Sequence, residues 1–501
     1  MFVKMCSGSA AEAADTKKPM SRTLALAVCS AAIGGTFQYG YNISIINSPT
    51  TYIQDFINSS CVERWGTALE TTQLTFVWTF IVSAFSLGGF FGALLGGPMA
   101  VRLGRKSSLL LNNSFLVIGA VLVLTCRLAK SFEMLILARF LVGINSGVSM
   151  NVQHMYVVES APKHHRGAVV FISAVFTAFG IFLGQIVGLS VLLGTEPHWH
   201  YLLASNALPG LIQLVTLPWF PESPRYLLID RSDKEACMNA LRSLNNGEVP
   251  VSEMDEMLQE QEQLKCAALN SGPETSALTM WSLFWNCDLR PQLIVIVVAG
   301  STVMLCGIDA IYFYSLYIFS QAGIPSEKIE FVTIGTGACE LLASLFSILL
   351  VDRLGRRALL IGGYSLMTIF LIVLTVALTL ETKHVPGMPY VSMVCVFAFI
   401  IFFGLGPAGV TCLLPAEIFD QVARPAAGMI CGSLYWICLF LVGMVFPFMI
   451  HTLDSFCFLP FMVVCLLTAI FFCLFLPETK GKTLAEITAV FGKKAEKGLK
   501  K

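Results

Sequence analysis

Twelve runs of mostly apolar residues constrain this chain more than any other feature of its sequence. Each run reaches the roughly 20 residues that an α-helix needs to cross the hydrocarbon core of a bilayer. The runs lie at 24–47, 76–98, 107–127, 133–158, 166–190, 198–220, 291–320, 328–351, 358–381, 389–414, 425–450 and 455–476. We therefore expect an all-α membrane protein with twelve transmembrane helices.

The composition agrees with a membrane protein and excludes several other classes. Hydrophobic residues make up 55% of the chain and charged residues only 13%, whereas a soluble domain is about a quarter charged. The net charge is zero, so nothing indicates a nucleic-acid partner. Most of the 16 cysteines stand in apolar runs, where they act as small hydrophobes, and none has zinc-ligand spacing. We expect no metal, no cofactor and no enzymatic reaction.

Lysine and arginine are concentrated on one side of the predicted membrane, and basic loops face the cytosol. The basic set is Arg102, Arg105, Lys106, Lys163, Arg166, Arg353, Arg356, Arg357 and Arg424. The opposite loops hold only Arg64, Arg127, Lys130, Lys328 and Lys383. We therefore expect a multi-pass protein of the plasma membrane with both termini in the cytosol. Asn58 starts an Asn-Ser-Ser glycosylation sequon in the first outside loop.

The long segment between the sixth and seventh runs alternates charged and apolar residues at helical spacing, and it is either a set of short cytosolic helices or a solvated linker. The chain then divides into a tail at 1–23, a six-helix half at 24–220, this segment at 221–290, a second six-helix half at 291–476 and a tail at 477–501.

Three motifs of the first half recur in order in the second half, which indicates an internal duplication. The sequence Arg-Leu-Gly-Arg at 102–105 returns at 353–356, and Glu159 with Arg166 returns as Glu417 with Arg424. Pro221-Glu-Ser-Pro-Arg returns as Pro477-Glu-Thr-Lys-Gly. All of these motifs lie at cytosolic helix ends, so the halves share one topology and are related by an axis along the membrane normal.

Arginine and glutamate at these helix ends have the chemistry of a gate. Ion pairs across the seam between the halves would close the cytosolic side, and a network of such pairs biases two states of similar energy. The alternative is that the arginines only set the orientation of the helices. The gating candidates are Arg105, Glu159, Arg166, Glu222, Arg225, Arg356, Glu417, Arg424 and Glu478 at the cytosolic side, with Tyr314 in an outer aromatic gate or a plain packing cluster.

The repeated motifs also carry a family resemblance. Phe37-Gln-Tyr-Gly-Tyr-Asn, Glu159-Ser-Ala-Pro-Lys, Pro221-Glu-Ser-Pro-Arg and Pro477-Glu-Thr-Lys-Gly-Lys-Thr stand in the same order in the sugar porters of the major facilitator superfamily. The chain resembles the facilitative hexose transporters among them, in particular the class II, fructose-type branch. The resemblance implies a major facilitator fold with two parallel six-helix repeats, and transport by alternating access.

The resemblance also implies where a solute binds. Polar and aromatic residues at the family's binding positions are Tyr41, Asn42, Ser173, Asp309, Glu340, Tyr435 and Trp436. Other positions have lost their amides or tryptophan, as at Ala174, Val303, Met304 and Val410. Asp309 and Glu340 stand where relatives carry amides, and charges at membrane depth are costly. A protonated carboxyl would replace an amide; the alternatives are a structural role, pH-sensitive transport or selection of a cationic solute.

The expected function is uniport of a hexose such as fructose or glucose by a monomeric protein. Proton-coupled relatives carry an aspartate where this chain has Asn42, and an amide does not exchange a proton at physiological pH. Gly404, Gly406, Pro407 and Gly409 predict a broken or bent tenth helix. Two alternatives remain: a transporter of another small polar solute, such as urate, and a solute sensor that does not transport.

Overall fold

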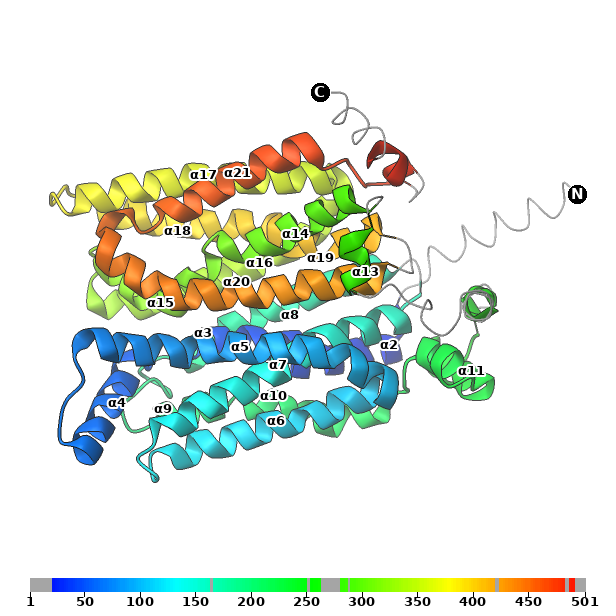
Figure 1. The fold of residues 1–501 in the computed structure, drawn as a ribbon, viewed down its shortest axis with the longest axis horizontal. Helices are drawn as coiled ribbons and strands as arrows, with labels where there is room; N and C mark the ends of the chain where they lie inside the picture. The colour runs from blue at the N-terminus through cyan, green and yellow to red at the C-terminus, as the bar shows by residue number, and fades with distance from the viewer. Residues whose placement is uncertain are drawn as a thin grey trace, which may run out of the picture.

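The structure is a computed structural model that describes residues 20–162, 165–249, 253–262, 280–286, 289–419, 423–482 and 486–491. The described part is helical and contains no strand. Long helices run side by side in two stacked bundles, one coloured blue to green and the other green to red (Figure 1). Each bundle corresponds to one half of the predicted repeat.

The first bundle is built from the helices before residue 220. They are α2 (Arg22–Ala32), the π-helix η1 (Ile33–Phe37), α3 (Gln38–Ser44), α5 (Thr71–Leu103), α6 (Arg105–Cys126), α7 (Phe132–Ser160), α8 (Arg166–Val187), α9 (Trp199–Ala204), α10 (Ala207–Thr216) and the 3₁₀ turn η3 (Leu217–Trp219). A shorter helix, α4 (Thr50–Trp65), lies outside the spans in the first loop.

The second bundle repeats this arrangement. Its helices are α14 (Arg290–Leu305), α15 (Ile308–Gln321), α16 (Ser326–Leu354), α17 (Arg356–Glu381), α18 (Met388–Leu405), α19 (Pro407–Ile418), α20 (Arg424–Leu453), the 3₁₀ turn η5 (Asp454–Phe456) and α21 (Leu459–Phe475).

These helices confirm the predicted twelve-span fold. Eleven helical segments of the described chain are long and apolar enough to cross a bilayer. The twelfth runs from Arg22 to Ser44 through α2, η1 and α3, which gives roughly 35 Å at 1.5 Å per residue. Ser21 caps this segment, because its hydroxyl accepts a hydrogen bond from the Leu24 N–H at 3.0 Å.

Breaks within the spans occur where glycine stands. Gly307, with φ of 93°, separates α14 from α15 in the middle of the seventh span. Gly406, with φ of −121° and ψ of −83°, ends α18, and Pro407 begins α19. The predicted discontinuity of the tenth helix is therefore confirmed.

The connecting segment folds into short helices at one end of the molecule: η4 (Tyr226–Asp230), α11 (Lys234–Leu244), residues 253–262 and α13 (Met280–Trp285). We call this the α11 end, and the opposite end, which carries α4, the α4 end (Figure 1). The first turn of α2 lies at the α11 end, where the Ser21 hydroxyl bonds the Leu244 carbonyl.

Candidate functional site

The repeated Leu-Gly-Arg turns adopt the same conformation in both halves. Gly104 has φ of 96° and ψ of 165°, and Gly355 has φ of 86° and ψ of 165°, a region that other residues rarely enter. The Glu222 carboxylate accepts the Lys106 N–H at 2.9 Å, and Glu478 accepts the Arg356 N–H at 2.9 Å. A Cβ at Gly104 would lie 2.5 Å from Glu222, and one at Gly355 would lie 2.7 Å from Glu478. Both turns therefore require glycine.

A buried ion pair follows the turn in the first half. Arg105 Nε lies 2.9 Å from Glu159, and its Nη1 lies 2.7 Å from Asp230 in η4. The Ser223 hydroxyl donates a hydrogen bond to the same Glu159 oxygen that Arg105 Nε approaches, and Arg105 Nη2 donates to the other oxygen at 3.0 Å. The arginine thus joins the ends of α6 and α7 to the connecting segment.

The second half repeats this pair with equivalent residues. Arg356 Nε lies 2.9 Å from Glu417 at the end of α19. The Thr479 hydroxyl donates to the other oxygen of Glu417 at 2.6 Å, so a hydroxyl binds this glutamate as the Ser223 hydroxyl binds Glu159. The sequence duplication is therefore also a duplication of contacts.

In this structure Glu159 and Glu417 each bind the arginine of their own half. Pairs across the seam are expected in the state with the cytosolic side closed, so that expectation stays a prediction. The other candidates lie around them. Arg166 donates to the Ala161 carbonyl at 3.3 Å, and Arg225 pairs with Glu260. The side chain of Arg424 lies outside the described residues.

The backbone around the second Leu-Gly-Arg turn changes the pKa of the Glu478 carboxyl. Burial alone would raise its pKa, but backbone N–H groups of Lys480, Arg356, Arg357 and Thr479 donate to it. These hydrogen bonds outweigh the burial and hold the pKa of Glu478 below its usual range. The Glu478 carboxylate that binds these N–H groups is therefore charged at neutral pH.

Hydrogen bonds cross the seam between the halves at the α4 end. Gln185 in α8 donates to the Thr336 hydroxyl at 2.9 Å and accepts the Gly337 N–H at 3.1 Å. Glu330, in α16 like Thr336 and Gly337, accepts from the Ser190 hydroxyl at 2.9 Å. The seam is thus closed at the α4 end by polar contacts.

Asn47 adds a further contact across the same seam, because its amide donates to the Ser315 hydroxyl in α15 at 2.6 Å. Toward the α11 end the halves meet through apolar packing, since a Cβ at Gly409 of α19 would lie 2.4 Å from the Phe171 ring of α8. The seam is therefore polar at the α4 end and apolar at this contact.

Asp309 and Glu340 lie near the middle of their spans, on the second half. Asp309 is 3% exposed and Glu340 is 5% exposed. The Tyr312 hydroxyl donates a hydrogen bond to Glu340, whereas Asp309 Oδ2 has no hydrogen-bond partner. The two carboxyl groups lie near one another and near the Tyr39 and Tyr435 side chains.

Aromatic side chains join this pair to the first half. The Tyr39 and Tyr435 hydroxyls, from α3 and α20, lie 2.5 Å apart across the seam. The Trp436 ring packs edge-on against Tyr39 at 5.5 Å between centroids and lies against Gly89 of α5. We call the six residues Tyr39, Asp309, Tyr312, Glu340, Tyr435 and Trp436 the mid-span cluster.

The cluster contains four of the seven residues that we expected to bind solute. The structure places Tyr41 and Asn42 inside the first half, where the Tyr41 hydroxyl bonds Ser205 at 2.6 Å and Asn42 accepts from Asn206 at 3.0 Å. Ser173 accepts from Gln153 at 3.1 Å in the same half. Sequence reasoning missed Tyr39, whose place in the Phe37-Gln-Tyr-Gly-Tyr motif was the available signal.

Tyr314 and Asn58 lie toward the α4 end. Tyr314 has φ of −129° inside α15, and its hydroxyl donates to the Gly443 carbonyl at 3.2 Å, so it joins two helices of one half. Asn58 is half-buried in α4, and its side-chain oxygen accepts from the Leu69 N–H at 3.1 Å.

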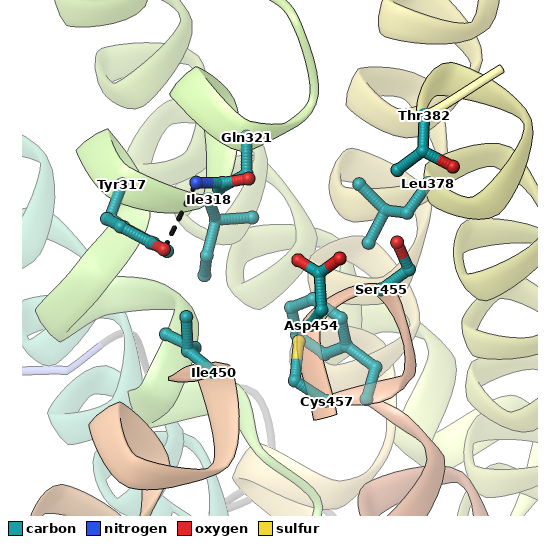
Figure 2. A pocket seen from close by; sticks show the side chains of 10 residues that line it. Tyr317, Ile318, Gln321, Leu378, Thr382, Ile450, Asp454, Ser455 and Cys457 are labelled. Carbon is teal, nitrogen blue, oxygen red and sulfur yellow. Dashed lines mark hydrogen bonds between the residues drawn. The ribbon is translucent and has the colours of Figure 1, made fainter. Parts of the chain in front are cut away.

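A separate hollow opens between helices of the second half at the α4 end. Asp454 and Ser455 face it from one side and Tyr317 and Gln321 from the other (Figure 2). The Gln321 amide donates to the Tyr317 hydroxyl at 3.1 Å within α15. None of the mid-span cluster lines this hollow.

Twelve spans in two repeated halves, with a buried polar cluster on the seam, define a membrane transporter of the major facilitator fold. The proton:xylose symporter XylE bound to 6-bromo-6-deoxy-D-glucose superposes with a TM-score of 0.77 at 24% identity, covering 94% of this chain and 100% of that one. A partially occluded, inward-open structure of the xylose transporter XylE from E. coli superposes with a TM-score of 0.75 at 23% identity, covering 93% of this chain and 100% of that one. At this identity the likeness concerns the fold.

Sequence relatives give the family. A profile described as "Sugar (and other) transporter" matches residues 27–491. Human facilitated glucose transporter member 11 is 52% identical over 93% of this chain and 92% of its own length. Member 5 from Equus caballus is 44% identical over 95% of this chain and 93% of its own length. Member 9 from Mus musculus is 42% identical over 95% of this chain and 87% of its own length. The chain belongs to the sugar transporter family, which confirms the resemblance; the family is one of transporters and not of enzymes.

Proposed function

We propose that this protein carries a hexose such as glucose or fructose across the membrane by alternating access, as a monomeric uniporter. The observation that carries the proposal is the mid-span cluster, in which polar and aromatic side chains of both halves meet at the depth where transporters of this fold bind solute. The names of the relatives, facilitated glucose transporters, support a sugar as the solute.

Alternating access requires each half to move as a unit while the seam opens and closes. The contacts of Arg105 with Glu159, and of Arg356 with Glu417, tie helix ends together within each half. The hydrogen bonds of Gln185 and Asn47 lie on the seam and have to break when the α4 end opens. The gate is then the seam, and the repeated ion pairs keep each moving half intact.

Uniport follows from the surroundings of Asn42. Within the described part of the first span no side chain is acidic, and the buried Arg139 guanidinium donates to the backbone carbonyl of Asn42 at 3.3 Å. Arg139 also lies 4.7 Å from the Phe85 ring centroid. An amide beside an arginine does not bind and release a proton over the physiological range, so this span couples no proton to the solute.

The α11 end is the cytosolic end in this proposal, because the basic loops lie there. The α4 end then faces the outside of the plasma membrane, and Asn58 is the glycosylated residue. Both termini follow into the cytosol, because α2 begins and α21 ends at the α11 end.

Uptake by the purified protein in proteoliposomes tests the proposal. We expect labelled glucose or fructose to enter faster than labelled L-glucose, and unlabelled hexose to compete. Binding of hexose without flux would identify a sensor. Flux of urate but not of any hexose would identify a transporter of another polar solute. Either result contradicts the proposal.

A further inference from the structure

The hollow at the α4 end lies apart from the mid-span cluster, and all of its lining residues belong to the second half. They come from the ends of α15, α17 and α20, from η5 and from the turn that follows it (Figure 2). The hollow contains about 420 Å³ of space, part of it open to solvent. Sites for small molecules have volumes of about 300–1,000 Å³, so the hollow is large enough for a small organic ligand.

The rim of the hollow presents hydrogen-bond acceptors. The Asp454 carboxylate and the side-chain oxygen of Gln321 both point toward its middle (Figure 2). The Gln321 amide nitrogen is turned away, because it donates to the Tyr317 hydroxyl at 3.1 Å. The Thr382 hydroxyl donates to the Thr379 carbonyl at 2.7 Å, so its oxygen is left as an acceptor. A ligand at this rim therefore has to donate hydrogen bonds.

The charge at the rim is negative and is not compensated. Asp454 has no ion-pair partner, and its carboxylate has no hydrogen bond, among the described residues. The carboxylate of Glu381, the residue before Thr382, lies so close to Gly323 that a Cβ there would be 2.5 Å away, and it also lacks a described ion-pair partner. Lys383 is exposed and does not line the hollow. A positively charged donor is therefore favoured over a neutral one.

The backbone at Asp454 is strained in a way that presents this carboxylate. Its φ of 46° and ψ of −119° lie in a region that residues with a Cβ rarely enter. Residues held in such regions are frequent at ligand-binding sites. The strained turn into η5 directs the Asp454 carboxylate into the hollow rather than away from it (Figure 2).

The walls below the rim are apolar. Ile318, Leu378, Ile450 and Phe458 line them, and each of these side chains is buried. The Tyr317 ring, 40% exposed, adds an aromatic face, and aromatic faces attract ammonium groups. Such walls favour a carbon skeleton over a hydrated metal ion. In the described part of the chain no group of three or more His, Cys, Asp or Glu side chains could hold a metal.

We infer that this hollow binds an organic ammonium ion from the solvent at the α4 end, namely a primary amine with a small apolar body. The ammonium group lies between the Asp454 carboxylate and the Gln321 side-chain oxygen, and the carbon skeleton packs against Leu378 and Phe458. This site goes beyond the proposed carriage of a hexose, because it lies off the seam and within one half.

Occupancy of the hollow acts on the gate through α15. Tyr317 and Gln321 stand at the end of this helix, and Ser315, two residues before Tyr317, accepts the seam hydrogen bond from Asn47 at 2.6 Å. A ligand in the hollow joins the end of α15 to α17 and η5, and so opposes movement of α15 when the seam opens. The ligand therefore slows transport without entering the mid-span cluster.

Binding of benzylammonium and of benzyl alcohol to the purified protein tests the inference. The two probes share a ring and differ in the ammonium group. Saturation-transfer NMR, with the signal from empty micelles subtracted, gives the affinity of each. We expect benzylammonium to bind roughly 3- to 10-fold more tightly, because an exposed ion pair and a charged hydrogen bond add to the same apolar contact. Asp454→Asn should remove this preference, whereas Asp55→Asn, which changes an exposed acid of α4 in the first half, should keep it.

Equal affinities for the two probes in the wild type would overturn the inference, and so would a preference that survives in Asp454→Asn. Benzylammonium should also lower the maximal rate of hexose uptake by wild-type proteoliposomes and leave uptake by Asp454→Asn unaffected. No inhibition, or equal inhibition of both proteins, overturns the link to the gate. The wild-type binding comparison needs neither uptake nor a variant, so it decides the ammonium site even if the hexose proposal fails.

Discussion

Gln185 is the side chain whose loss should open the α4 end most directly. It makes two hydrogen bonds across the seam, to the Thr336 hydroxyl at 2.9 Å and from the Gly337 N–H at 3.1 Å. Each is worth about 0.5–1.5 kcal/mol net, so Gln185→Ala should cost the closed state about 1–3 kcal/mol. In the open state these groups reach water, so the variant loses nothing there. The equilibrium should shift about 5- to 150-fold toward the open state.

Distances between labels at the α4 end measure this shift. Thr67 and Lys383 are exposed positions on the first and second half, and spin labels there report the opening of the seam. Gln321→Ala is the matched control, because Gln321 bonds Tyr317 within its own helix and not across the seam. We expect longer distances in Gln185→Ala and wild-type distances in the control. Identical distributions in all three proteins would refute the assignment of Gln185 to the gate.

Four further predictions follow. Glu478→Gln should lower stability by about 1 kcal/mol, read from thermal melting in detergent. Because the folded protein holds the pKa of Glu478 low, this carboxylate stabilises the fold fully above the ordinary carboxyl pKa, and the stabilisation is lost as pH falls through the lowered pKa. The melting temperatures of the wild type and of Glu478→Gln should therefore converge in acid. Gly355→Ala should cost about 1–3 kcal/mol at its φ of 86°, whereas Gly362→Ala, with open space around it, should be harmless; equal melting temperatures would contradict this. Asn42→Asp should make the uptake rate depend on pH, and a flat pH profile would count against the uniport argument. Asn58→Gln should remove the glycan and increase electrophoretic mobility, and unchanged mobility would contradict glycosylation at Asn58.

The spans and the repeat could be predicted because the bilayer imposes them on the sequence. A run of apolar residues must be a helix in a solvent without hydrogen-bond donors, so the twelve spans needed no tertiary information. The break at Gly406 and Pro407 was predictable for the same reason, since glycine and proline interrupt a helix locally.

The sequence did not predict which face of the first span lies on the seam between the halves. Tyr39 and Tyr41 are two residues apart, which turns them about 200° around a helix, so they point to opposite sides. Every residue from Gln38 to Ser44 is buried, which leaves no polar stripe to tell the seam from the interior of the half. Only the packing of α3 against α20 brings Tyr39 to Tyr435 and leaves Tyr41 with Ser205.

The partners of the repeated charges were equally hidden. Glu159 and Glu417 stand at helix ends that approach both the seam and the connecting segments, and sequence does not decide between them. The folded chain brings the Ser223 and Thr479 hydroxyls to these glutamates, which fixes each carboxylate within its own half. Contacts between residues more than 50 positions apart carry this information.

Counterflow tests the central claim most directly. Proteoliposomes loaded with unlabelled hexose and diluted into a trace of labelled hexose should accumulate label transiently and then lose it, because the site is exposed to one side at a time. The transient should be unchanged by an imposed pH gradient, since nothing but the hexose is carried. A lasting accumulation driven by the pH gradient would contradict uniport, and no transient in vesicles that contain folded protein would contradict alternating access.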